Sequence, residues 1–86
     1  MAKYDPLFRR LCQTPDEPIG LTFDAIAQLV GGLPKSALKY RPWWGNEVDG
    51  RHMQAQAWLN AGREVEAVDL DARAVRFGPA AWRRGA

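Results

Sequence analysis

Apolar residues recur at helical spacing through the first two-thirds of the chain. Asp5-Pro6 predicts a helix start, because aspartate caps helix N-termini and proline suits the first helical position. Pro15 ends this segment. Its apolar face comprises Leu7, Phe8, Leu11 and Cys12. A second helix is capped by Thr22 and stopped by Gly31-Gly32. Its apolar stripe comprises Phe23, Ile26, Leu29 and Val30.

Two further helices are expected in the middle of the chain. A short third helix begins at Pro34 or Ser36 and runs through Tyr40, because the residue before Pro42 avoids helical angles. A loop over residues 43–50 and a fourth helix over 51–61 follow. The inner face of the fourth helix is expected to comprise Met53 or Gln54 together with Ala57, Trp58 and Ala61.

Alternating positions predict strands in two places. A short strand is expected at Ile19–Leu21, and a hairpin at residues 63–77 with its turn at Asp71-Ala72. The apolar phase switches near Glu66–Val68, which indicates a β-bulge. Because a lone hairpin is marginally stable, we expect the first strand to pair with it. The result is an α/β (α+β) fold with four short helices and a small three-stranded antiparallel sheet. With one central helix as an insertion, this is the element order of a winged helix.

Composition bounds the class of protein. The 86 residues fit a single winged-helix-like domain at 1–78 followed by a basic tail at 79–86. No apolar run is long enough to span a membrane, and residues 1–10 lack a signal-peptide core, so a cytoplasmic, nucleoid location is expected. The single cysteine, Cys12, excludes an internal disulfide and a cysteine-based zinc site. A net charge of +2 permits a nucleic-acid partner without demanding one.

The segment Leu33–Asn46 concentrates cations and contains no acid. Lys35 and Lys39 are four residues apart and share one helical face, and Arg41 follows them. A phosphate backbone would neutralise these like charges. The alternative is a solvated face, since cations are favoured near a helix C-terminus.

Two adjacent tryptophans lie in the same segment. Neighbouring side chains of an extended chain point in opposite directions, so we expect either Trp43 or Trp44 to be exposed and able to stack on a base, a sugar or a partner. The alternative places both indoles on opposite sides of a thin core. Asn46 is expected to serve as a turn or cap residue within the same interface.

The fourth helix competes with the third for recognition. Its first turn contains Arg51 and His52, which suit phosphate near free backbone N–H groups. Gln54 and Gln56 have side chains that read adenine, although such amides are also common on exposed helix faces. The spacing of acids around His52 matches no zinc or nuclease pattern, so no catalytic or metal site is expected.

An acidic hairpin supports a different class of function. The predicted hairpin contains Glu64, Glu66, Asp69 and Asp71. A wing that contacts phosphate is usually basic. The alternative is therefore a protein-interaction adaptor that uses the hairpin and an exposed tryptophan.

Two resemblances add to these patterns. The segments KYDPLFRRL, LTFDAIAQLVGGLPKSALKYRPWWGN and QAQAWLNAGREVEAVDLDARAVRF resemble a small bacterial domain family of uncharacterised function. The stretch LTFDAIAQLVGGLPKSALK is similar to the helix-turn-helix of alkylguanine DNA alkyltransferases and their alkyltransferase-like relatives. That resemblance implies that Ser36 and Ala37 face DNA. The reactive Pro-Cys-His-Arg motif is absent, so repair chemistry is not implied.

The sequence thus favours a non-enzymatic protein that binds double-stranded DNA, as a regulator, accessory factor or nucleoid component. No cofactor is expected, and the protein would be a monomer or homodimer. The expected interface comprises Lys35, Ser36, Lys39, Arg41, Trp43, Trp44, Asn46, Arg51, His52, Gln54 and Gln56.

Overall fold

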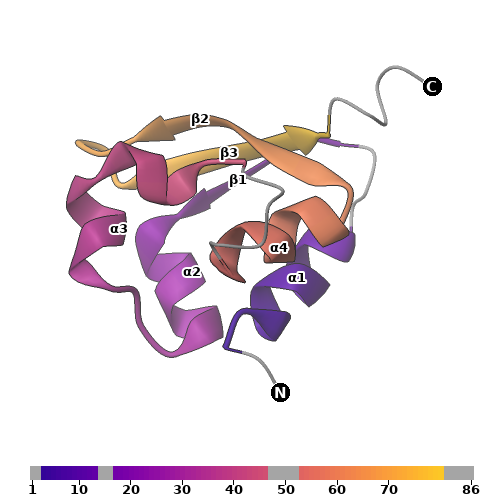
Figure 1. Ribbon diagram of the computed structural model, residues 1–86, viewed down its shortest axis with the longest axis horizontal. Coiled ribbons are helices and arrows are strands. Elements are labelled where there is room, and N and C mark those ends of the chain that lie inside the picture. Colours follow the sequence, from indigo (N-terminus) through magenta and orange to yellow (C-terminus); the bar gives the residue numbers. More distant parts are fainter. Residues whose placement is uncertain (1–2, 14–16, 47–52, 81–86) are drawn as a thin grey trace.

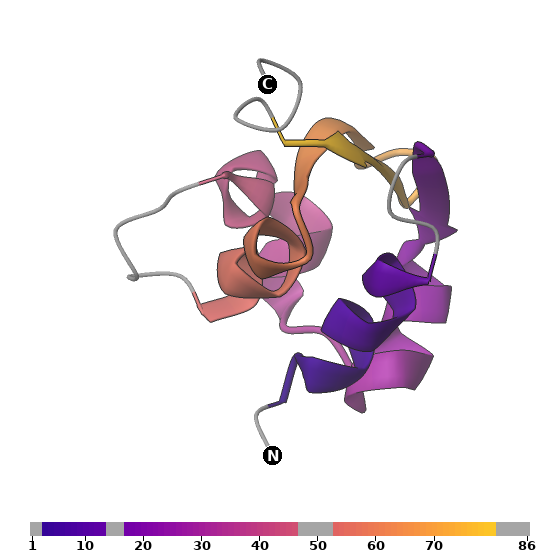
Figure 2. The same cartoon turned by 90° about the vertical axis from the view of Figure 1, so that its right-hand side faces the viewer.

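A computed structural model describes residues 3–13, 17–46 and 53–80 as a two-layer α+β fold (Figure 1). The elements in chain order are α1 (Asp5–Cys12), β1 (Ile19–Thr22), α2 (Phe23–Val30), α3 (Lys35–Lys39), the 3₁₀ helix η1 (Arg41–Trp44), α4 (Met53–Asn60), β2 (Arg63–Asp69) and β3 (Ala74–Pro79). The predicted combination of four short helices and a three-stranded antiparallel sheet is confirmed. All described helices lie on one side of the sheet (Figure 2). None of the described helices is long and apolar enough to cross a bilayer.

The sheet has the order β1-β3-β2, so the short first strand pairs with the hairpin as expected. Glu64 lies opposite Gly78, and β3 runs to Pro79, two residues beyond the predicted end of the hairpin at residue 77. The expected bulge is present, because the register shifts between Val65 and Ala67. The extra residue, Glu66, lies over Gly78, where a Cβ would collide with the carboxylate.

Local signals explain how α2 begins and ends. The Thr22 side chain accepts a hydrogen bond from the Ala25 backbone N–H at 3.0 Å, which satisfies one free donor of the first turn. Gly31 ends the helix in a left-handed conformation with φ 81°. Glycine adopts this conformation at little energetic cost because it has no Cβ. The Phe23 backbone N–H donates to the Arg73 carbonyl at 2.8 Å and ties the helix start to the hairpin.

A row of aromatic rings forms the centre of the core. Trp44 stacks on Phe23 with centroids 5.0 Å apart and on Trp58 at 5.9 Å. Trp58 in turn contacts Phe77 of β3 at 5.6 Å. This row joins α2, η1, α4 and the sheet, so a small domain buries large side chains along a single line.

The prediction that one of the adjacent tryptophans is exposed is wrong. Trp43 is 9% and Trp44 is 2% exposed. The expected loop begins instead with η1, and successive side chains of a 3₁₀ helix are about 120° apart, so both rings turn inward. Trp43 packs edge-on against Trp44 at 4.7 Å and against Tyr4 at 6.2 Å. The third helix also ends at Lys39, one residue earlier than expected.

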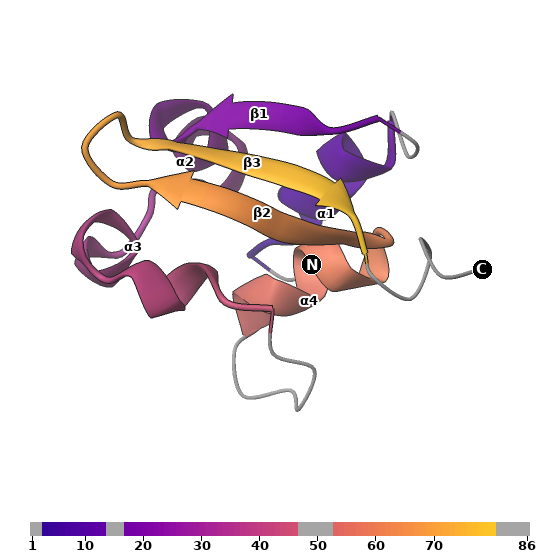
Figure 3. The ribbon, with the colours of Figure 1, turned by 90° about the horizontal axis from the view of Figure 1, so that it is seen from above.

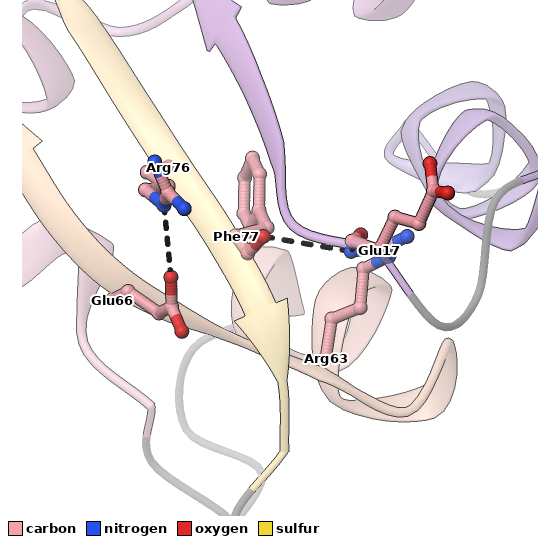
Figure 4. A network of polar contacts seen from close by, with 5 residues as sticks. All are labelled: Glu17, Arg63, Glu66, Arg76 and Phe77. Carbon is pink, nitrogen blue, oxygen red and sulfur yellow. Dashed lines mark hydrogen bonds and ion pairs between the residues drawn. The ribbon is translucent and has the colours of Figure 1, made fainter.

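Arg63 lies inside the molecule, although its charge predicts exposure. Its Nε donates to the Leu11 carbonyl at 2.8 Å. Its Nη1 donates to the Glu17 carbonyl at 2.6 Å and lies 3.5 Å from the Phe77 carbonyl (Figure 4). The guanidinium therefore links the end of α1, the segment before β1 and strand β3.

Candidate nucleic-acid interface

The short helix α3 carries two cations and no acid. Lys35, Ser36 and Lys39 are exposed, whereas Ala37 is fully buried and seats the helix on the core. Neither lysine forms an ion pair within the described part of the chain. The two cations expected to share a helical face therefore do so without an acidic partner in those residues.

Arg41 extends this surface toward the hairpin. Its guanidinium is exposed and its Nη1 donates to the carbonyl of Val68 on β2. This contact places the start of η1 beside the strand that ends at the hairpin turn (Figure 3). Because the side chain is exposed and a guanidinium has five N–H donors, Arg41 has further donors besides the one bonded to Val68.

Tyr40 is a residue of this surface that the sequence-based interface omits. Its side chain is 59% exposed, and it lies between the cations Lys39 and Arg41. The available signal was position, because Tyr40 lies between two cations in the acid-free segment Leu33–Asn46. We call Lys35, Ser36, Lys39, Tyr40 and Arg41 the α3 surface.

The side-chain amide of Asn46 forms its hydrogen bonds within the fold rather than with a ligand. Its Oδ1 accepts from the Trp58 indole N–H at 3.0 Å and from the Val65 backbone N–H at 2.8 Å. Its Nδ2 donates to the Val65 carbonyl at 3.0 Å. The side-chain amide thus pairs with the outer edge of β2 as a neighbouring strand would. This contact gives a structural reason for an asparagine two residues after the tryptophan pair.

Gln54 does not contribute to the surface either. It is 7% exposed, and its Nε2 donates to the Trp43 carbonyl at 3.0 Å. Of the two alternatives for the inner face of α4, Gln54 is therefore correct and Met53, at 65% exposed, is wrong. Burial also removes Trp43, Trp44 and Gln54 from the expected DNA contacts.

Gln56 is exposed, but it lies on α4 beside α1 and not on the α3 surface. It lines a groove of about 230 Å³ between α1 and α4. The other lining residues are Tyr4, Asp5, Phe8, Met53, Ala57 and Asn60. Burial in this region raises the pKa of the Tyr4 hydroxyl, which keeps it a neutral donor. Arg51 and His52 fall outside the described residues.

The described residues contain no group of at least three His, Cys, Asp or Glu side chains that could hold a metal ion. Cys12 is exposed at the end of α1, not part of the buried face that the pattern predicted. The α3 surface offers cations and one exposed aromatic ring.

Fold and surface together define a small α+β domain with a cationic helix face. The chain belongs to the family described as Domain of unknown function (DUF7662), whose match covers residues 4–80. The expected membership of a small uncharacterised domain family is thereby confirmed. Neither a curated protein nor a solved structure gives a significant match.

Proposed function

We propose that this domain binds double-stranded DNA through the α3 surface, as a regulator, accessory factor or nucleoid component without catalytic activity. The observation that carries the proposal is the pair Lys35 and Lys39. Both are exposed on one face of a short helix and neither has an acidic partner among the described residues. Phosphates would relieve the repulsion between these cations, and release of counterions would add to the affinity.

The surrounding architecture supports this proposal. α2 and α3 are consecutive helices joined through a turn at Gly31 and Gly32, which both have positive φ. The hairpin and β1 form one sheet, and with one central helix counted as an insertion, the element order is that of a winged helix. In a helix-turn-helix, the second helix enters the major groove, so α3 would occupy that position.

Removal of the two lysines tests the proposal directly. We expect wild-type protein to bind a random duplex with a log–log salt slope of a few units. Lys35→Ala with Lys39→Ala should weaken binding similarly for all sequences and lower the slope by up to about one unit per lost phosphate contact. Fluorescence anisotropy across a salt series measures both quantities.

A matched control removes the same charge elsewhere. Arg9→Ala with Arg10→Ala takes two cations from the last turn of α1, away from α3 (Figure 1). We expect this variant to retain nearly all of the slope. Equal losses in the two double variants would reduce the effect to net charge, and absence of binding at low salt would remove the proposal.

A second candidate is an adaptor that docks through the outer face of the sheet. No described helix covers this face (Figure 3). A shallow depression of about 620 Å³ lies there. Small residues form part of its floor, and small side chains on a strand often mark close approach of another backbone or ligand. The lining residues are Gly20, Arg41, Ala67, Val68, Asp69, Ala74, Val75 and Arg76.

The acidic charges give the adaptor less support than the sequence suggested. The Asp69 carboxylate accepts hydrogen bonds from the backbone N–H groups of Asp71 and Ala72, each at 3.0 Å, and so caps the hairpin turn. Glu66 pairs with Arg76 at 3.1 Å (Figure 4). The exposed tryptophan that the adaptor required is not found among the described residues. DNA binding therefore stands first.

A further inference from the structure

Tyr40 differs from the other large aromatic residues of the described chain. Phe23, Trp44, Trp58 and Phe77 form the core row, and each is at most 2% exposed. Tyr40 is 59% exposed and makes no ring contact within the described residues. The core therefore uses the other large aromatic rings for packing, whereas the Tyr40 ring faces solvent.

The backbone that carries Tyr40 is held on both sides. Its N–H donates to the Ser36 carbonyl at 2.8 Å, and its carbonyl accepts from the Trp43 N–H at 3.0 Å. The buried Trp44 indole N–H donates to the Ala37 carbonyl at 2.9 Å and fixes η1 against α3. Hydrogen bonds therefore order the backbone on both sides of the ring, and an ordered backbone lowers the entropic cost of binding.

Cations lie on both sides of this junction along the chain. Lys39 precedes Tyr40, and Arg41 follows it with its guanidinium anchored to the Val68 carbonyl. A phosphate bound by either cation would lie one residue along the chain from the ring. Phosphate contacts position nucleic acid, whereas an aromatic face stacks on any base that it can reach.

We infer that the α3 surface binds preferentially to duplex DNA containing an unpaired base, with Tyr40 as the platform on which that base stacks. This inference rests on the proposed function and specifies its substrate class. In an intact duplex the faces of the bases are occupied by their neighbours, so the ring gains little. A bulged or mismatched base leaves the stack at low cost and offers its face.

The test uses anisotropy with two labelled probes of the same sequence, an intact duplex and a duplex with one bulged base. Stacking on an aromatic side chain typically changes affinity by about tenfold per base. We expect wild-type protein to bind the bulged probe about tenfold more tightly. Tyr40→Ala should abolish this preference with the salt slope unchanged, and Tyr40→Phe should keep it, since the ring remains.

Lys39→Ala is the matched control on the same surface. It should weaken binding to both probes equally and lower the salt slope, because it removes a phosphate contact rather than a stacking face. Thermal melting of each variant confirms folding, which exposed substitutions should leave intact.

The outcomes separate this inference from the function beneath it. Equal wild-type affinity for the two probes, or equal losses on both in Tyr40→Ala, overturns the inference and leaves DNA binding standing. Loss of the preference in Tyr40→Phe also overturns it, because the hydroxyl would then be the contact. Absence of binding to either probe at low salt overturns both proposals.

Discussion

At the scale of single residues, two polar side chains stabilise the fold by forming hydrogen bonds with backbone groups of distant segments. Asn46 pairs with the outer edge of β2, and Arg63 binds carbonyls of three separate segments. The sequence marks neither role, because an asparagine after an aromatic pair and an arginine at a strand start are ordinary surface choices. Their partners lie between 12 and 52 residues away along the chain, where no local pattern reaches.

Arg63→Ala should lower the free energy of unfolding by about 3–5 kcal/mol, because buried carbonyls lose their donor and a cavity remains. Arg63→Lys should recover only part of this loss, since an ammonium cannot reproduce the planar fork. Urea denaturation of both variants provides the measurement. Lys39→Ala, exposed on α3, is the control and should stay within about ±0.5 kcal/mol. Near-normal stability of Arg63→Ala would contradict the linking role.

At the scale of elements, the reliable predictions came from strong local signals. Thr22 and Gly31 bound α2 as expected, and the phase switch in the hairpin is a true bulge. The sequence could not predict η1, because a 3₁₀ segment of four residues is too short to display a hydrophobic period. That omission led directly to the wrong exposure for one of the tryptophans. The pattern nonetheless identified Trp58 as the inward anchor of α4, and its side chain is fully buried.

Trp58→Ala should destabilise the domain by about 3–5 kcal/mol, which is much of the stability that so small a fold possesses. The indole contacts both Trp44 and Phe77, so its loss opens the middle of the aromatic row. Trp58→Phe is the informative companion, since it keeps most of the packing but removes the hydrogen bond to Asn46. Its expected loss is about 1–3 kcal/mol. Thermal and urea melts check both values, and a cooperative Trp58→Ala variant with unchanged melting would refute the anchor.

At the scale of the whole molecule, the layers sort the candidate residues into separate surfaces. The lysines of α3 face solvent near the turn end of the hairpin, whereas Gln56 lies with α1. Local spacing correctly predicted that Lys35 and Lys39 share a face. It could not show that α4 directs its exposed amide elsewhere, because that depends on how helices pack on one sheet. The same layering leaves the opposite sheet face without a covering helix in the described structure (Figure 3).

Because these surfaces are separate, a substitution on the sheet face distinguishes the two proposed functions. Ala67 is exposed in the depression on the sheet, where its Cα lies opposite that of Arg76 on β3. Ala67→Arg places a long cation there and should block any protein that docks on this face. If α3 binds DNA, the variant should keep wild-type affinity or gain slightly, because an added cation favours phosphate. Anisotropy with the random duplex measures this, and size-exclusion chromatography checks that the variant stays folded and unaggregated.

A loss of DNA affinity larger than that of the lysine double variant would transfer the DNA contact from α3 to the sheet face. Unchanged DNA affinity, combined with a lysine double variant that is silent, would instead leave the adaptor as the better proposal.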